Sequence, residues 1–177
     1  MAPKASSASQ IQTLSSVSDP KDPQYVSLTQ TFLKRLGIHK PVPRSCEISG
    51  FYSNFFGSFL KVNDIRKGQI SCTIVVKPQI INAFGTLHGG SVGSLIELLS
   101  IACARTVIAE DKELFLGEIS VSYLSAAPNY TEVLAEASVV KSGRNVTMVA
   151  LEFKLKKTGN LIYIAHATFY NIPAAKL

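Results

Sequence analysis

Cysteine and histidine are scarce and scattered in this chain of 177 residues. The three cysteines, Cys46, Cys72 and Cys103, form no CxxC pair, and the three histidines are also scattered along the chain. This spacing gives no support to a zinc site, so we predict no bound metal. An odd number of cysteines is typical of reduced thiols, which predicts an intracellular compartment.

Long apolar runs and phosphate-loop motifs are also missing. The longest apolar run, residues 95–109, is broken by Glu97 and Arg105, so no transmembrane helix is predicted. No Gly-Lys-Ser/Thr follows the glycines, which excludes a phosphate loop, and we predict no cofactor. The 18 Lys and Arg against 12 Asp and Glu give a net charge of +6. This excess suits an anionic ligand and does not by itself indicate nucleic acid.

The remaining composition, 46% apolar and 17% charged, is that of one globular domain with a tail. Residues 1–20 are rich in Ser and Ala and predict a flexible tail, with a transit peptide as the alternative. Residues 21–44 predict a short helix and a linker, because Leu28, Phe32 and Leu36 follow helical spacing. We expect the main domain over residues 45–172 and an exposed targeting tail over 173–177.

Apolar periodicity predicts how the main domain is built. Residues 44–62 are aromatic and contain glycine, which suits an irregular segment leading into a first strand near 57–63, and residues 70–76 alternate as a second strand. The only long helix is predicted over residues 88–108, apolar on most faces and therefore buried. Four strands joined by short turns follow residue 112. The order predicts an α+β fold, a curved antiparallel sheet around one central helix, with a second subunit completing an edge or face.

Polar and glycine residues gather where the long helix is predicted to begin, in the segment Asn82-Ala-Phe-Gly-Thr-Leu-His88-Gly89-Gly90. Two glycines let a ligand approach the backbone closely. The first N–H groups of a helix have no internal partner and lie at its positive end. The Gly89 N–H can therefore hold a carbonyl oxygen that gains charge. The alternative is that the glycines only permit tight packing of helix on sheet.

Glu97 is an acid inside this otherwise apolar helix, between Ile96 and Leu98. A buried carboxylate is costly unless it is paired, and burial tunes its basicity. Glu97 is therefore a candidate catalytic residue. The alternatives are a hydrogen-bonded core acid or a helix face that reaches solvent at a subunit boundary.

The motif Asn-x-x-Gly-x-Leu-His-Gly-Gly, with an acid nine residues after the histidine, resembles that of the hotdog-fold acyl-CoA thioesterases. Within them it is similar to the group of acyl-CoA thioesterase 13 and the phenylacetyl-CoA-type enzymes, over about residues 45–171. The resemblance implies a hotdog fold and hydrolysis of a fatty or aryl acyl-CoA in lipid metabolism. It also implies a homodimer or homotetramer whose active site lies between two subunits.

The same resemblance implies roles for individual residues. Glu97 would be the nucleophile or the general base, and Asn82 would orient the nucleophile or the water. His88 would order the loop and contact the thioester, which Gly89 would hold. The alternative is that a lone His at a helix start is only a cap or a structural hydrogen-bond partner. The implied coenzyme A residues are Gly90, Tyr123, Lys141, Ser142, Gly143, Arg144, Asn145, Val146 and Tyr170. Arg144 can bind phosphate through its forked donors, although Lys141 and Arg144 also suit a solvated turn.

Two positions depart from the family pattern and open an alternative function. Where related enzymes place a Ser or Thr near the acid, this chain has Leu116 and Ile101, with Ser94 and Ser100 as nearby candidates. The alternative is a non-catalytic acyl-CoA or lipid-binding module. A third hypothesis is an aryl-CoA thioesterase whose aromatic residues stack on the substrate ring, with four candidates that suit the core equally well: Phe51, Phe55, Phe56 and Phe84.

The final three residues, Ala175, Lys176 and Leu177, are similar to the Ser-Lys-Leu peroxisomal address. This similarity predicts a peroxisomal protein with an import receptor as a partner. A cytoplasmic location is the alternative, in which the ending is accidental.

Overall fold

The computed structural model of the chain describes residues 23–38 and 40–173. They fall into two units, one ending at Ile48 and the other beginning at Ser49. The tail predicted over residues 1–20 lies outside the described residues, as does the predicted targeting tripeptide at 175–177. None of the helices among the described residues is long and apolar enough to span a membrane.

The first unit contains helix α1 (Pro23–Arg35) and the 3-10 turn η2 (Arg44–Cys46). The spacing of apolar residues predicts α1 correctly. The helix ends because Gly37 adopts a φ of 79°, a left-handed conformation that side-chain-bearing residues rarely take. The Gly37 N–H donates to the Lys34 carbonyl at 3.0 Å, which satisfies one of the last helical acceptors.

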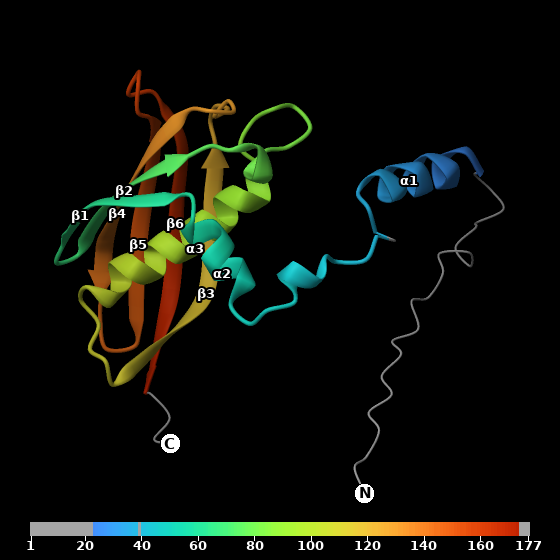
Figure 1. Cartoon of the computed structure of the whole chain (residues 1–177). Coiled ribbons are helices and arrows are strands. Elements are labelled where there is room, and N and C mark those ends of the chain that lie inside the picture. Colours follow the sequence, from blue (N-terminus) through green and yellow to red (C-terminus); the bar gives the residue numbers. More distant parts are fainter. Residues whose placement is uncertain (1–22, 39, 174–177) are drawn as a thin grey trace, which may run out of the picture. The chain divides into compact units, whose positions relative to one another are not determined.

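The second unit is a six-stranded antiparallel sheet that curves around one helix, α3 (Gly89–Arg105), as Figure 1 shows. The predicted α+β architecture is confirmed. The strand order is β1-β2-β4-β5-β6-β3, which leaves β1 and β3 as the two edges. The strands are β1 (Leu60–Arg66), β2 (Gln69–Val75), β3 (Lys112–Tyr123), β4 (Glu132–Ser142), β5 (Val146–Leu155) and β6 (Leu161–Pro173).

The core lies between α3 and the concave face of the sheet. Val92, Leu95 and Ile96 of the helix are fully buried and so are Phe153 and Phe169 of the strands. The alternation predicted along β2 is also correct, because the residues on its inner face are all buried: Ile70, Cys72, Ile74 and Val76. Burial of these apolar side chains fixes α3 on the sheet and thereby fixes the position of its first turn.

The segment predicted as irregular contains a helix instead, α2 (Phe51–Gly57), and the first strand begins at Leu60. Aromatic residues favour strands by propensity, which makes this segment ambiguous in sequence. In the structure they pair at helical spacing, with ring centroids 5.8 Å apart for Phe51 and Phe55 and 4.9 Å for Tyr52 and Phe56. Phe56 is buried in the core, so tertiary packing outweighs the local preference.

The strands after residue 112 were predicted to be joined by short turns. The segment between β3 and β4 does contain a turn, in which the Thr131 N–H donates to the Pro128 carbonyl at 3.3 Å, but it is a crossover between strands that are not neighbours. Strand β3 pairs with β6, and β4 pairs with β2 and β5. On its way across, the segment forms a bridge between Thr86 and Pro128. The Asn129 N–H also donates to the Gly85 carbonyl at 2.9 Å. These contacts hold the loop before α3 against the crossover.

Candidate active site at the start of the central helix

His88 caps helix α3. It is exposed, and its Nδ1 accepts a hydrogen bond from the Gly90 N–H at 2.9 Å. A backbone N–H can only donate, so Nδ1 carries no proton in this arrangement. The neutral ring then carries its proton on Nε2. His88 is thus a cap, which was one of the expected roles, and it also has an outward hydrogen-bond donor.

Gly89 is the first residue of α3, where helical N–H groups have no acceptor within the helix. Its carbonyl accepts a hydrogen bond from the Tyr123 hydroxyl at 2.9 Å. A Cβ added to Gly89 would lie 3.5 Å from that hydroxyl, and one added to Gly90 would lie 3.2 Å from His88 Nδ1. Gly90 therefore leaves room for the His88 ring at the helix start, whereas a Cβ at Gly89 would make only ordinary contact with Tyr123.

Asn82 organises the loop before α3. Its Oδ1 accepts from the N–H groups of Phe84 at 2.9 Å and Thr86 at 3.2 Å. Its Nδ2 donates to Thr86 Oγ1 at 3.0 Å. Gly85 completes the turn with a φ of 74°. Within this chain Asn82 thus shapes the loop, and its role in orienting a nucleophile or a water stays a prediction.

A pocket of about 270 Å³ opens beside this loop and brings together Asn82, Gly89 and Tyr123 of the predicted site residues. Thr86, Leu124 and Tyr163 also line the pocket, although no motif in the sequence pointed to them. Tyr163 is buried on the inner face of β6, and burial raises the pKa of its hydroxyl. In sequence it could not be distinguished from a core residue, because it follows the alternation of its strand.

Glu97 was expected to be buried, and the structure corrects this. Ile96 faces the sheet with no exposed surface, whereas Glu97 on the next position is only half-buried. Its carboxylate makes no hydrogen bond or ion pair with another described residue. It lies eight residues after Gly89, about 12 Å further along the helix axis at 1.5 Å per residue. Glu97 and Gly89 therefore do not meet within one chain.

The two serines near Glu97 are already engaged. Ser94 Oγ donates to the Gly90 carbonyl at 3.0 Å, and the Tyr52 hydroxyl of α2 bonds to Ser94 Oγ. Ser100 Oγ donates to the Glu97 carbonyl at 3.0 Å and is fully buried. Neither hydroxyl has a proton left with which to hold a water beside the carboxylate.

The predicted coenzyme A turn lies at the other end of the sheet from Gly89. In the β3–β6 register Tyr170 is opposite Phe115, whereas Tyr123 is opposite Tyr163. These positions on β3 are eight residues apart, or about 26 Å at 3.3 Å per residue. Tyr170 is also opposite Val146, so it shares its end of the sheet with the predicted turn residues Lys141, Ser142, Gly143, Arg144 and Asn145.

Residues that the sequence analysis did not single out hold this turn. Asn171 Nδ2 donates to the Gly143 carbonyl at 2.8 Å, and Lys112 Nζ donates to the Arg144 carbonyl at 3.0 Å. Gly117 leaves room for the Tyr170 ring, since a Cβ there would lie 2.5 Å from Tyr170 Cε2. Lys141 and Arg144 stay exposed, with their cationic groups open to a ligand.

Among the four phenylalanines considered for ring stacking, the structure separates core from surface. Phe56 is buried, and Phe55 packs against the core. Phe84 is 89% exposed on the loop that Asn82 shapes. Of the four, Phe84 is therefore the residue that lies on the surface near the pocket.

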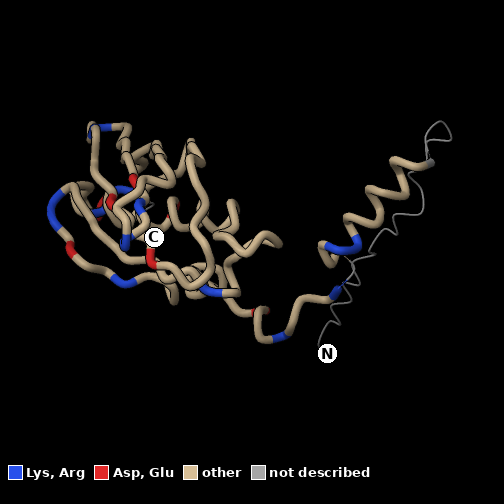
Figure 2. The backbone as a smooth tube through the Cα atoms, turned by 90° about the horizontal axis from the view of Figure 1, so that it is seen from above, with Lys and Arg blue, Asp and Glu red and all other residues tan. Residues whose placement is uncertain are grey.

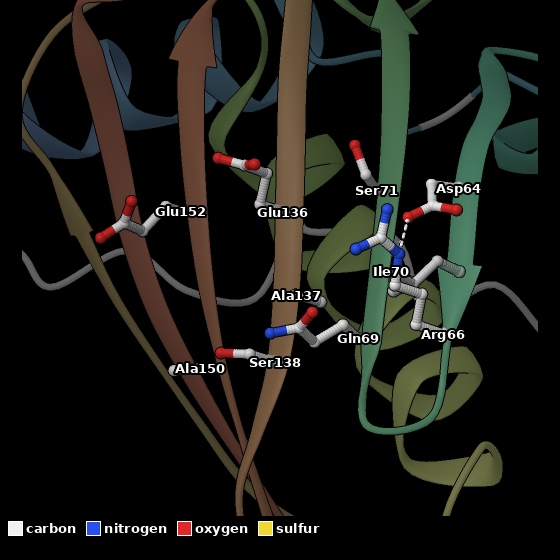
Figure 3. A pocket seen from close by; sticks show the side chains of 10 residues that line it. All are labelled: Asp64, Arg66, Gln69, Ile70, Ser71, Glu136, Ala137, Ser138, Ala150 and Glu152. Carbon is white, nitrogen blue, oxygen red and sulfur yellow. Dashed lines mark ion pairs between the residues drawn. The ribbon is translucent and has the colours of Figure 1, made fainter.

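A larger hollow of about 540 Å³ lies on the outer face of the sheet (Figure 3). Asp64 and Arg66 form an ion pair at 2.7 Å on its rim. Lys154 bonds to Glu152 at 2.8 Å and to Glu136 at 3.0 Å, and these hydrogen bonds raise the pKa of Lys154. None of the predicted site residues lines this hollow.

Neither the charged residues nor the potential metal ligands of the described part of the chain form a second candidate site. Figure 2 shows Lys and Arg at several separate turns and strand ends of the second unit, with Asp and Glu between them. Over residues 23–38 and 40–173, no three His, Cys, Asp or Glu side chains lie close enough to hold a metal ion.

Known proteins that are similar to this chain include thioesterases. The family model described as "Thioesterase superfamily" matches residues 84–162. A Caenorhabditis elegans protein, named only provisionally as an esterase, is 33% identical over 98 residues, which cover 55% of this chain and 57% of that protein. Human acyl-coenzyme A thioesterase 13 is 27% identical over 95 residues, covering 54% of this chain and 67% of that protein. The alignments thus span little more than half to two thirds of these relatives.

The fold is also found in solved structures. The crystal structure of zebra fish thioesterase superfamily member 2 superposes with a TM-score of 0.64 at 25% identity, covering 71% of this chain and 88% of the other. A curved antiparallel sheet around one long helix is the hotdog arrangement, so the predicted fold is confirmed.

Proposed function

We propose that this chain is a member of the thioesterase superfamily that hydrolyses an acyl-CoA thioester to a free acid and coenzyme A. The observation that carries the proposal is the start of α3, where two adjacent residues supply hydrogen-bond donors and one of them, Gly89, lines a pocket. These are the Gly89 N–H at the positive end of the helix and the Nε2–H of His88.

Both donors suit the chemistry of thioester hydrolysis. Attack on the carbonyl carbon moves negative charge onto the carbonyl oxygen, and the C–S bond then breaks to release the coenzyme A thiolate. Donors that are fixed before the reaction stabilise this charge without reorganisation. Loss of one such donor typically lowers the rate by about 10²–10³.

In the proposed enzyme, Glu97 of a second copy acts on the thioester that Gly89 and His88 hold. Its carboxylate has no partner among the described residues of its own chain and lies about 12 Å along the helix from Gly89. Strand β3 is an edge with unpaired backbone groups, which suits pairing with a second copy. Glu97 either attacks the carbonyl carbon itself or removes a proton from the attacking water.

Such pairing would also bring a coenzyme A site together. When two β3 strands pair about a two-fold axis, they run in opposite directions. The turn over residues 141–146 of one copy then comes to the Gly89 end of the other. Arg144 and Lys141 can bind the phosphates there, while the thioester lies at Gly89.

The test is release of free thiol from a panel of acyl-CoA substrates that covers short, long and aryl acyl groups. We expect turnover of at least one class and a loss of about 10²-fold or more in Glu97→Gln. Glu110→Gln is the matched control, because Glu110 is an exposed acid beyond the end of α3. Full turnover in a Glu97→Gln protein of unchanged oligomeric state would remove Glu97 from the mechanism.

One observation favours a second candidate, a binding module that retains acyl-CoA without hydrolysis. Ser94 and Ser100 are engaged within α3, and Leu116 and Ile101 are apolar and partly buried against the core. Neither serine hydroxyl therefore has a proton free to donate to the attacking water. Saturable binding of acyl-CoA with no thiol release across the panel would favour the binding module.

A further inference from the structure

We propose that Tyr123 is a positioning residue that sets the protonation site of His88 through the peptide group between Gly89 and Gly90. The Tyr123 hydroxyl donates to the Gly89 carbonyl oxygen at 2.9 Å. The N–H of Gly90 belongs to the same peptide group and donates to His88 Nδ1 at 2.9 Å. The three groups therefore form one continuous chain of hydrogen bonds.

The physical basis is polarisation of the peptide group. A donor on a carbonyl oxygen draws electron density toward that oxygen, so the N–H of the same amide becomes a stronger donor. Hydrogen bonds in a chain strengthen one another in this way by roughly 10–30% per bond. A stronger bond from the Gly90 N–H keeps Nδ1 unprotonated, and the proton of the neutral ring stays on Nε2.

The surroundings of Tyr123 hold its hydroxyl in place. Its ring packs edge-on against Tyr163, with centroids 5.5 Å apart, and Tyr163 is buried. Tyr123 ends β3, and its partner in the register is Tyr163 of β6. The hydroxyl thus reaches Gly89 from a strand of the sheet, not from the flexible part of a loop.

The same geometry gives Gly90 a reason that packing of helix on sheet does not. A Cβ on Gly90 would lie 3.2 Å from His88 Nδ1 and 3.3 Å from Cε1, which is tighter than ordinary contact. A Cβ on Gly89 would lie 3.5 Å from the Tyr123 hydroxyl, in ordinary contact. We therefore expect Gly90→Ala to displace the imidazole of His88, and Gly89→Ala to disturb the chain of hydrogen bonds less.

The experiment uses the full chain labelled with ¹⁵N-histidine. Two-dimensional ¹H–¹⁵N spectra report which ring nitrogen of His88 carries the proton, and the His88→Ala variant assigns its signals. In the wild type we expect Nδ1 unprotonated. In Tyr123→Phe we expect the population with a proton on Nδ1 to rise several-fold, with unchanged thermal unfolding as the check on folding. Gly90→Ala should move the same signals by an independent route.

The catalytic consequence rests on the proposed function. Tyr123→Phe removes one neutral hydrogen bond, the one to the Gly89 carbonyl. We therefore expect its kcat to fall about three- to tenfold, with KM within about twofold of the wild-type value. Tyr130→Phe is the matched control, because it removes an exposed tyrosine hydroxyl that bonds to no other described residue. It should change neither the His88 signals nor turnover.

The outcomes separate the two proposals. Unchanged His88 signals in both Tyr123→Phe and Gly90→Ala would overturn the positioning role. A rise in KM alone in Tyr123→Phe, with unchanged His88 signals, would make Tyr123 a coenzyme A contact only and would also overturn it. If the wild type hydrolyses no acyl-CoA, the proposed function fails, while the spectra still decide how His88 is held.

Discussion

Gly117→Ala tests the packing that positions Tyr170 at the predicted coenzyme A end of the sheet. Gly117 lies where the β3–β6 register shifts between Leu116 and Glu118. An added Cβ would lie 2.5 Å from Tyr170 Cε2 and 3.0 Å from Cδ2, closer than real side chains approach. The φ of Gly117 is not positive, so the backbone itself accepts alanine. The Tyr170 ring must therefore turn away.

The magnitude follows from how freely that ring can move. Overpacking in a closed core costs about 1–3 kcal/mol. Tyr170 is 52% exposed and can swing outward, so we expect a loss near the lower end, about 1 kcal/mol. In a Tyr170→Ala background the clash is gone. There Gly117→Ala should be neutral or stabilising by up to about 1 kcal/mol, because alanine restricts the unfolded chain.

Urea unfolding of the four proteins in this cycle measures the coupling between the two positions. We expect a coupling of about 1–2 kcal/mol, as for residues in direct contact. Gly57→Ala is the matched control, because nothing lies within 4 Å of a Cβ at that glycine. The same stability change for Gly117→Ala in both backgrounds would refute the packing argument.

The remaining predictions concern the thiols and the loop before α3. At pH 8 an alkylating reagent should modify Cys46 within minutes and leave Cys72 and Cys103 unmodified in the native protein, because both are buried and burial raises the pKa of each. Burial raises the pKa of Cys103 from 9.0 to about 11, so the folded state holds the thiol proton more tightly than the unfolded state does. The resulting stabilisation of the folded state is fully present below pH 9. This contribution to the free energy of unfolding should be lost as the pH rises from 9 to about 11. Urea unfolding of the wild type and of Cys103→Ala measures it, and an identical decline in stability at high pH in both proteins would contradict the prediction. Asn82→Ala removes the acceptor for two loop N–H groups and should speed chymotryptic cleavage after Phe84 severalfold, whereas Asn82→Asp should not.

Periodicity was sufficient to predict most of the elements of this fold. A period of two along residues 70–76 can only bury one face of a strand, and the structure buries it. The long apolar segment after His88 is too long for a strand and forms α3. The capping role of His88 was one of the possibilities at a helix start, because a polar side chain there can accept from an unpaired N–H.

The contacts that could not be predicted from the sequence depend on which strands pair in the sheet. Nothing local pairs β3 with β6, and only that pairing brings Tyr123 to Gly89 and Tyr170 to Gly117. The aromatic helix α2 was missed because tertiary contacts decide between helix and strand for such residues. Glu97 is half-buried because of the face of α3 on which it lies. The sequence did not reveal that face, because the helix is apolar on most sides.

The most direct test of a shared active site mixes two inactive variants. His88→Ala and Glu97→Gln subunits are each expected to form oligomers without effective turnover. If the site takes His88 from one copy and Glu97 from the other, half of the mixed dimers' sites are intact. Random pairing of equal amounts should then restore about a quarter of wild-type thioesterase activity. Mixed oligomers that show no more activity than the two variants alone would contradict the shared site.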